Sequence, residues 1–296
     1  MKLNKIASAI SRGLWLIEPR TASGLMPIAA KFLNGEKITA FDDNQPEGPS
    51  MYADGNFFGS NDEGFFDNVY NGSVLIIPIC GTIMKDDYCG EPGTDTMSEW
   101  LKCALDAPSI VGIVLKINSG GGSVEGTGEF ADLIKGASKP VITYTDGIMA
   151  SAAYWIGCSA LEIFASHKTV EIGSIGTAIS FYDNREAMEK FGYKQHYINA
   201  DSSPDKNQDY FKALDGDYSG IKINILNPTN DIFMTAVKNN RGDRLKTEKI
   251  ISNGVTFLEP LTGKMYLAET AISDYGLIDK IGSLQDAVDR VIELAA

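Results

Sequence analysis

From residue 73 onward, short apolar runs alternate with segments of helical periodicity, and this alternation restricts the folds open to the chain. Buried strands are predicted at 73–79, 111–117 and 141–145, where apolar and β-branched residues follow one another almost without interruption. Helices are predicted between them, over 96–105 and 124–136. Because parallel strands need crossover connections, repeated strand–helix–strand units predict an α/β fold.

The other elements are predicted from the same two periodicities. They are a helix that begins near residue 150, strands at 163–165 and 194–199, and helices at 184–191, 228–240, 247–252, 264–275 and 283–294. Helical spacing over 3–35 predicts an N-terminal helical arm, and the Asp, Asn, Gly and Phe residues of 41–72 are typical of a linker. The predicted organisation is an arm (1–40), an acidic linker (41–72) and a folded domain (73–296).

The acidic composition of the 296-residue chain excludes some classes of function. The chain carries 26 Lys and Arg residues against 39 Asp and Glu residues, a formal net charge of −13. General nucleic-acid binding depends on neutralising phosphates, so no nucleic-acid partner is expected. The apolar fraction of 44% is ordinary for a globular protein, so extensive disorder is not expected either.

Cysteine and histidine are too few and too scattered to predict a metal site. The four cysteines lack a Cys-x-x-Cys spacing, and the only histidines are His167 and His196. No metal, cofactor or disulfide framework is expected, and a reducing cytosol is the simplest environment. The apolar stretch 140–158 is interrupted by Asp146 and Gly147 and is interpreted as strand, turn and helix start. No signal peptide or membrane anchor is expected, which predicts a cytoplasmic location.

A run of glycines is the first candidate for a functional site. Residues 117–124 read Ile-Asn-Ser-Gly-Gly-Gly-Ser-Val and lie between a predicted strand and a predicted helix. Backbone N–H groups at such a junction can bind an anion, either a phosphate or the oxyanion of acyl transfer. A phosphate-binding P-loop would need a Lys after the glycines, and none follows here. A tight turn without a ligand explains the run equally well.

Ser151 is the second candidate. Residues 146–154 read Asp-Gly-Ile-Met-Ala-Ser-Ala-Ala-Tyr, which predicts a strand that turns sharply into a helix of small residues. A serine at such a turn resembles a nucleophile elbow, with the Ala152 N–H beside it. The competing interpretation is that Ser151 only caps the helix.

A serine nucleophile needs a base, and the sequence offers two kinds. His167 and His196 have no obvious carboxylate partner and are interpreted as surface residues. A lysine whose pKa is lowered by desolvation is the alternative. Composition and spacing leave the choice open among Lys168, Lys190, Lys194, Lys206 and Lys212.

Taken together, segments 118–124, 146–154 and 173–176 resemble the S49 peptidase family, which includes bacterial signal peptide peptidase A and the phage capsid proteases. The family pattern reads NSPGGxV, then a small-residue Ser-Ala-Ala-Tyr segment, then GSIG, and Gly120 stands here in place of the proline. Residues 276–282 also resemble the closing GLxDxIG pattern of the family. The resemblance covers residues 73–296 and implies a ClpP/crotonase-like fold, a repeated ββα spiral.

The resemblance also implies roles for individual residues. Ser151 matches the nucleophile, and the oxyanion hole matches Gly121, Gly122 and the N–H of Ala152. Ser174, in the GSIG motif, matches the serine that hydrogen-bonds the catalytic lysine.

The family's lysine follows the strand after GSIG in a Gly-x-x-Lys-Asp-like context, and the matching segment here is 200–207. Lys206 is therefore predicted to be the base, with Lys212 as the reserve candidate. The glycine is absent here, and Asn207 stands in place of the usual Asp. Such a Ser–Lys dyad needs a neutral lysine, so burial and a neighbouring hydroxyl matter more than a carboxylate.

The start of the chain looks like the N-terminal arm of phage and prophage S49 peptidases. The predicted function is therefore phage head maturation, the cleavage of a capsid or scaffold protein in the host cytoplasm or the assembling procapsid. Family members form rings, so a homo-oligomer is expected. Three alternatives stay open: a bacterial signal-peptide-peptidase-like protease in the cytosol, a crotonase-like CoA-binding protein that would not need Ser151, and a non-catalytic assembly factor.

Overall fold

The structure is a computed structural model that describes residues 14–17, 48–59, 66, 69–87 and 91–296. Its strands are β1 (Leu14–Ile17), β2 (Ser50–Ala53), β3 (Asn56–Gly59), β4 (Ser73–Ile83), β5 (Ile110–Ser123), β6 (Val141–Ala150), β7 (Glu162–Ala165), β8 (Glu171–Gly173), β9 (Ala178–Ile179), β10 (Glu248–Ser252), β11 (Val255–Glu259), β12 (Met265–Leu267) and β13 (Lys280–Ile281). Its helices are α3 (Thr94–Asp106), α4 (Thr127–Lys135), α5 (Ala152–Gly157), α6 (Arg185–Lys190), α7 (Gln208–Leu214), α8 (Ser219–Ile221), the π-helix η1 (Lys222–Leu226), α9 (Asn227–Arg241), the 3₁₀ turn η2 (Gly242–Arg244), α10 (Ala268–Ser273) and α11 (Leu284–Ala295).

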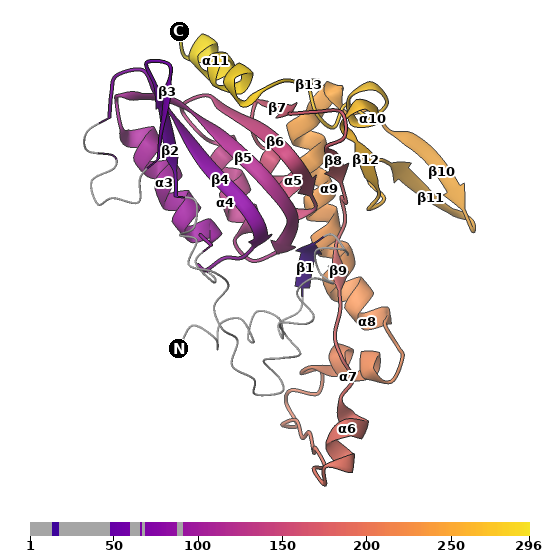
Figure 1. Ribbon diagram of the computed structural model, residues 1–296. Helices are drawn as coiled ribbons and strands as arrows, with labels where there is room; N and C mark the ends of the chain where they lie inside the picture. The colour runs from indigo at the N-terminus through magenta and orange to yellow at the C-terminus, as the bar shows by residue number, and fades with distance from the viewer. Residues whose placement is uncertain (1–13, 18–47, 60–65, 67–68, 88–90) are drawn as a thin grey trace.

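One large sheet organises the molecule, and its central strands β4, β5, β6 and β7 are parallel neighbours (Figure 1). Strand β8 runs parallel to the end of β6, while the β2–β3 hairpin adds antiparallel to β4. The parallel strands are joined by α3, α4 and α5, so the α/β class predicted from the sequence is confirmed.

The central strands are buried on both faces, which explains why they are apolar without interruption. In β4, Leu75 and Ile77 pack into the larger core beneath α3, α4 and α5, while Val74 and Ile76 pack into the smaller core beneath α11. Gly112 lets α11 lie close to the sheet, because a side chain there would collide with Val291. The Ser283–Asp286 capping box fixes where α11 begins.

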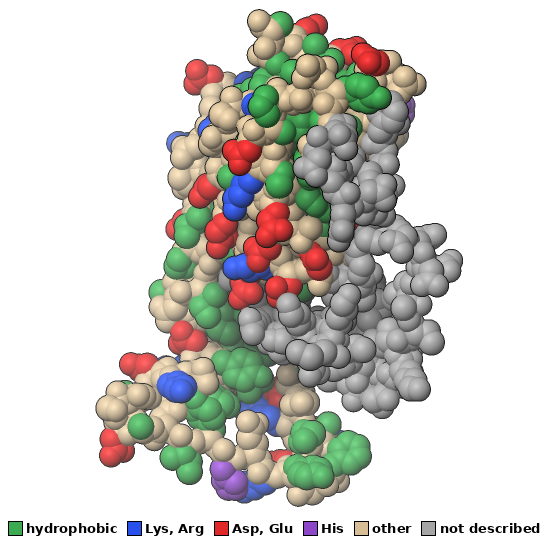
Figure 2. All heavy atoms as spheres, turned by 90° about the vertical axis from the view of Figure 1, so that its left-hand side faces the viewer, with side chains coloured by type: hydrophobic (Ala, Val, Ile, Leu, Met, Phe, Trp, Pro, Cys, Tyr) green, Lys and Arg blue, Asp and Glu red, His purple; other side chains and the backbone are tan. Residues whose placement is uncertain are grey.

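Residues 181–218, here named the projecting segment, extend away from the sheet and carry α6 and α7 (Figure 1). Figure 2 shows hydrophobic side chains gathered on this part of the molecule. The large apolar side chains exposed on it are Tyr182, Met188, Phe191, Tyr193, Tyr197, Ile198, Tyr210 and Tyr218. A monomeric protein rarely exposes so many neighbouring apolar side chains, so this surface has the composition of an interface.

The structure differs from the sequence predictions near the N-terminus. A helical arm was predicted over residues 1–40, but its described part, residues 14–17, is the strand β1. The predicted linker 41–72 contains the β2–β3 hairpin, which pairs with β4 and extends the main sheet. Pairing with strands distant in sequence overrides local periodicity in both places. The other residues of the arm lie outside the described part of the chain, and the division into three units stays a prediction.

Three further predictions failed in the second half of the chain, one of them in part: within the predicted helix 264–275, residues 265–267 form β12 and α10 begins at Ala268. Residues 194–199 form no strand and are mostly exposed on the projecting segment. Residues 247–252 were predicted as a helix, but 248–252 form β10, which pairs with β11 through a turn at Asn253-Gly254. Both turn residues have positive φ, 51° and 76°, which is the geometry that an Asn-Gly hairpin turn requires. Within the described residues, no helix combines the length and the apolar run that crossing a bilayer demands.

Candidate active site

Ser151 lies at the turn between β6 and α5, as the sequence predicted. Its backbone has φ 56° and ψ −118°, a conformation that L-residues adopt at a cost of about 1–3 kcal/mol. Its side chain makes no capping hydrogen bond to α5, so the interpretation of Ser151 as a simple helix cap finds no support. Instead, the Ser151 hydroxyl donates to the Gly176 carbonyl at 3.5 Å.

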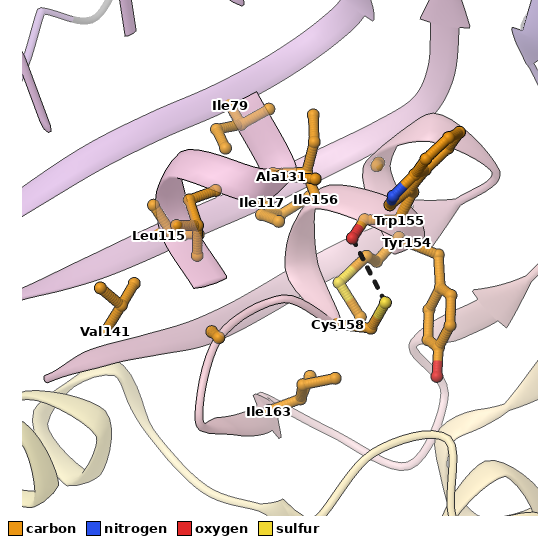
Figure 3. Close-up of a cluster of buried hydrophobic side chains, with 14 of the residues drawn as sticks. Ile79, Leu115, Ile117, Ala131, Val141, Tyr154, Trp155, Ile156, Cys158 and Ile163 are labelled. Atoms are coloured by element: carbon orange, nitrogen blue, oxygen red, sulfur yellow. Dashed lines mark hydrogen bonds between the residues drawn. The ribbon is translucent and has the colours of Figure 1, made fainter. Parts of the chain in front are cut away.

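The buried helix that follows Ser151 fixes its strained backbone conformation. All six residues of α5 are buried, and Figure 3 shows Tyr154, Trp155 and Ile156 among the side chains of the buried cluster, with the two aromatic rings pointing in different directions. Trp155 stacks on Phe233 of α9 with ring centroids 4.9 Å apart. The Tyr154 hydroxyl donates to the Leu277 carbonyl at 2.8 Å. Burial raises the pKa of the nearby Cys158 thiol to about 12, so that thiol is not a competing nucleophile.

The glycine run forms the last part of β5 rather than a turn before a helix, because β5 continues to Ser123 and α4 begins at Thr127. The parallel register with β4 continues to Gly122, opposite Ile83. A side chain at Gly122 would collide with the Ile83 backbone, which explains the glycine there. Gly121 and Gly122 therefore lie within the sheet, between β4 and β1, without the dipole of a helix N-terminus, whereas Ala152 begins α5.

Two polar side chains of β5 fix the backbone around the glycines, a role that was not predicted from the sequence. The Ser119 hydroxyl donates to the Gly81 carbonyl at 2.6 Å and accepts from the Gly121 N–H at 3.1 Å. The Asn118 side chain accepts from the Ile148 N–H at 3.2 Å, next to an irregularity in the β5–β6 register. Their position beside the glycine run was the signal that could have identified them.

The GSIG segment, residues 173–176, lies against Ser151. The Ser151 N–H donates to the Gly173 carbonyl at 2.9 Å, and the Ser174 N–H donates to the Lys264 carbonyl at 2.8 Å. Gly173 has φ 134°, and a side chain there would collide with the Lys264 carbonyl. Ser174 itself has φ 51° and is buried. All three motifs that carried the family resemblance thus meet in space, since the Asn118 side chain also bonds the Ile148 N–H.

The oxyanion candidates differ in what their N–H groups already contact. The Gly121 N–H donates to Ser119, as described, so it is engaged in this arrangement. Ala152 is the first residue of α5, and first-turn amides have no acceptor inside their own helix. The structure therefore leaves the Ala152 N–H better suited to a substrate oxygen than the Gly121 N–H.

The candidate lysines do not lie with Ser151 in the single chain. Lys206 is exposed immediately before α7, and Lys212 is exposed within α7. Figure 1 shows α7 on the projecting segment, away from α5 in the body of the molecule. His167 and His196 are also exposed, which agrees with their interpretation as surface residues.

Lys264 is the lysine whose backbone contacts the GSIG segment, but its side chain is unsuited to accept a proton. Its ammonium donates to the Glu259 carboxylate at 2.7 Å, and this hydrogen bond raises the pKa of Lys264. The same bond, together with one from Tyr266, lowers the pKa of Glu259. Lys264 therefore stays charged, whereas a general base must be neutral.

The closing GLxDxIG pattern has a structural role. Asp279 accepts two hydrogen bonds from the buried Arg241, at 2.8 and 2.9 Å, and a third from the Ile163 N–H at 2.7 Å. Arg241 also donates to the Gly276 carbonyl at 2.9 Å. These bonds tie the end of α9 to β7, so the motif supports the core behind α5. Among the described residues, no group of His, Cys, Asp and Glu side chains is arranged to hold a metal ion.

A strained serine between a strand and a buried helix, beside the glycine backbone of a neighbouring strand, is the arrangement of a serine hydrolase of α/β class. The family model described as Peptidase family S49 matches residues 134–296, more than half of the chain, and the chain belongs to that family of serine peptidases. A model described as Clp protease matches residues 95–164. With the parallel sheet and its crossover helices, these matches confirm the predicted ClpP/crotonase-like class.

Individual relatives match over parts of their length. Protease 4 of Haemophilus influenzae is 28% identical over 236 residues, which cover 77% of this chain and 35% of that protein. Capsid assembly protease C of Escherichia phage lambda is 28% identical over 131 residues, 42% of this chain and 29% of that protein. A ClpP1 mutant from Listeria monocytogenes has a TM-score of 0.38 at 17% identity, covering 72% of this chain and 94% of that one. The match to Protease 4 thus spans about a third of that relative.

Proposed function

We propose that the chain hydrolyses peptide bonds with Ser151 as nucleophile and Lys206 as general base. The observation that carries the proposal is the backbone of Ser151, held at φ 56° in front of a fully buried helix. Strain of this kind persists where the surrounding structure fixes it, and it concentrates at functional sites. Membership of a serine peptidase family supports the same role.

The proposed reaction begins with a neutral Lys206 amine, which accepts the Ser151 hydroxyl proton as the oxygen attacks a peptide carbonyl. Backbone N–H groups of Gly121, Gly122 and Ala152 are the proposed donors to the resulting oxyanion, with the smallest share from the engaged Gly121 amide. The peptide C–N bond then breaks, and the lysine gives its proton to the leaving amine. Water hydrolyses the acyl-enzyme with the lysine again as base. The proposed role of Ser174 is to position the lysine.

Lys206 has to reach Ser151 from elsewhere, and a second copy of the chain is the proposed source. In support, the projecting segment that carries Lys206 exposes large apolar side chains, with Phe191 at 78% and Ile198 at 90% exposure. A neighbouring copy that covers this surface would bury apolar area and desolvate the lysine at the same time. Desolvation lowers the pKa of a lysine, which the mechanism requires.

Single substitutions test the dyad. Ser151→Ala and Lys206→Ala are each expected to lower cleavage of an unfolded protein substrate by at least about 10³-fold, because each removes a reacting group. The thermal unfolding midpoint of Lys206→Ala should match that of the unmodified chain, since Lys206 is exposed. Lys212→Ala is the matched control and should retain activity. Full activity of Lys206→Ala would refute the assignment of the base.

A mixing experiment tests where the lysine comes from. Co-expression of the Ser151→Ala and Lys206→Ala chains would create some sites with Ser151 from one copy and Lys206 from another. With random assembly, about a quarter of the sites would carry both groups and activity would return. If each variant alone is inactive and the mixture stays inactive, the dyad does not form between copies.

For the biological role we propose phage head maturation, with a capsid or scaffold protein as the polypeptide substrate. The similarity to capsid assembly protease C of phage lambda supports this role. A signal-peptide-peptidase-like role is the second candidate, and the similarity to a protein of Enterococcus faecium named as a signal peptide peptidase, 24% identical over 249 residues, supports it. Incubation with a co-expressed major capsid or scaffold protein, compared with a synthetic signal peptide, distinguishes the two. Acyl-CoA turnover without proteolysis would point instead to a crotonase-like enzyme.

A further inference from the structure

Strand β5 changes its neighbour beside the nucleophile. On one edge, β5 pairs with β4 as far as Gly122. On the other edge, it pairs with β6 as far as Ser119, which lies opposite Met149. Strand β6 ends at Ala150, and the chain turns away from the sheet at Ser151, two residues beyond Met149. The backbone edge of Gly121–Ser123 is thereby released from β6 at the position of the nucleophile.

The released edge is filled by the protein's own N-terminal segment. Strand β1 (Leu14–Ile17) pairs antiparallel with Gly121–Ser123 of β5. Its opposite edge pairs antiparallel with β9, in which Trp15 lies opposite Ala178. Within the described residues, β9 has no sheet partner other than β1. The backbone edges of β5 and β9 thus face each other across a groove, and the short strand β1 occupies this groove.

The register brings the C-terminal end of β1 to the catalytic serine. Ile17 lies opposite Gly121 in the pairing with β5. Continuing the β1–β9 register by two residues beyond Trp15 and Ala178 puts Ile17 opposite Gly176, whose carbonyl accepts the Ser151 hydroxyl. Both registers therefore converge on Ser151. With β1 in place, Ser151 is 1% exposed.

We propose that residues 14–17 occupy the groove that binds the polypeptide substrate, and that this segment must leave before a substrate reaches Ser151. The inference rests on the proposed peptidase function. An extended peptide that adds to exposed strand edges gains main-chain hydrogen bonds on both sides, whatever its sequence. Strand β1 makes this pairing within the chain, in the direction antiparallel to β5, and a substrate taking its place would run the same way.

The tether gives β1 an advantage over any free peptide. A segment linked to its site acts at an effective concentration of about 1 mM, so a short peptide of ordinary affinity competes poorly with it. Competition of this kind reduces the apparent affinity for substrate by the fraction of molecules with an open groove. It does not change the rate once substrate saturates the groove. Release of β1 is therefore expected to lower KM and to leave kcat unchanged.

The first test is Leu16→Pro in the full chain. Proline removes a backbone N–H from the middle of β1 and disfavours a strand that is paired on both edges. We expect kcat/KM for an unfolded protein substrate to rise about tenfold or more, with kcat unchanged. Ser23→Pro, in the same N-terminal region but outside β1, is the matched control and should leave kcat/KM as it is. An unchanged kcat/KM for Leu16→Pro in an active, folded enzyme would overturn the proposal.

The second test does not depend on activity. A fluorescent peptide with the sequence of residues 11–20 is titrated into full chains that carry Ser151→Ala, with and without Leu16→Pro, and anisotropy reports binding. We expect the chain with Leu16→Pro to bind the peptide at least about tenfold more tightly, because its own strand has left the groove. Equal binding, or no binding, by two folded chains would overturn the proposal. Tighter binding in this assay, combined with no proteolysis by the chain that retains Ser151, would support the occupied groove while refuting the proposed function.

Discussion

The two halves of the proposed dyad lie in regions that are built differently. Ser151 stands in the body of the molecule, where α5 is entirely buried and Trp155 stacks on Phe233. Lys206 stands on the projecting segment, where Phe191 and Ile198 are exposed. The backbone of the nucleophile is fixed by the core of a single chain, whereas the surroundings of the lysine are incomplete. If a second copy supplies Lys206, as proposed, one chain fixes the nucleophile and assembly completes the site.

Contacts within the projecting segment are local and solvent-exposed. Arg185 bonds Asp183 and Asp215, both within the segment, at 2.7 and 2.8 Å. Tyr197 packs on Phe211 with ring centroids 4.4 Å apart. Exposed ion pairs contribute little to stability, so the segment is held mainly by short-range packing. The core, in contrast, joins residues far apart in sequence, such as Tyr154 and Leu277.

The largest expected difference between the two regions comes from removing an aromatic side chain in each. Trp155→Ala should lower the free energy of unfolding by about 3–5 kcal/mol, because it removes a buried ring from the core behind Ser151. Phe191→Ala should leave that free energy unchanged in the monomer. If a second copy covers Phe191, the same variant should weaken self-association. Urea unfolding and sedimentation velocity measure the two effects, and equal losses of stability in both variants would contradict the comparison.

A conservative change of arginine should produce a smaller difference. Arg241→Lys keeps the charge but loses the paired hydrogen bonds to Asp279, and we expect a loss of about 1.5–3 kcal/mol. Arg185→Lys makes the same exchange in the projecting segment, where solvent replaces the lost bonds, and its unfolding midpoint should not change. Chemical denaturation of the two variants makes the measurement. A loss at Arg185 as large as that at Arg241 would show that the segment is structured as firmly as the core.

The smallest expected effect is a change in the free energy of unfolding at acidic pH. Burial by itself would raise the pKa of Asp279, but the hydrogen bonds and charge of Arg241 hold that pKa below its ordinary value of 3.8. A carboxyl group with a lowered folded-state pKa stabilises the fold above its unfolded-state pKa, and the contribution is lost as pH falls through the folded-state pKa. The stability difference between the unmodified chain and Asp279→Asn should therefore be constant from pH 7 to about pH 5 and shrink below about pH 4. Unfolding in urea at several pH values tests this, and a difference that shrinks between pH 7 and pH 5 would contradict it.

The sequence predicted the body well because its signals there are redundant. The apolar runs of β4, β5 and β6 must be buried on both faces, and that requires helices on both sides of a parallel sheet. Ser151 was found because a strand and a helix of small residues meet there, and the structure puts it at that junction. The catalytic role of Ser151, like that of Lys206, stays a prediction.

What the sequence did not predict depends on partners distant in the chain. Residues 14–17 have helical spacing, but β1 forms because β5 and β9 offer unpaired edges on either side of it. The hairpin at Asn253-Gly254 carried a local signal that the helical periodicity of 247–252 concealed. The placement of Lys206 away from Ser151 could not be predicted from motif order, because motifs order residues along the chain and do not specify how far apart they lie in space.

The backbone at Ser151 has a consequence for how the protein would change over generations. Glycine adopts positive φ without the penalty that serine incurs, so replacing Ser151 with glycine would relieve about 1 kcal/mol or more of strain. Glycine loses about 0.5–1 kcal/mol of this relief through the larger conformational entropy it gives up on folding, so folding alone gives little preference for the serine. In a gene copy released from selection for catalysis, glycine at this position would therefore be tolerated. If Ser151 is the nucleophile, as proposed, selection for the reaction would keep the serine in place, and a relative with glycine at this position would be expected to lack peptidase activity.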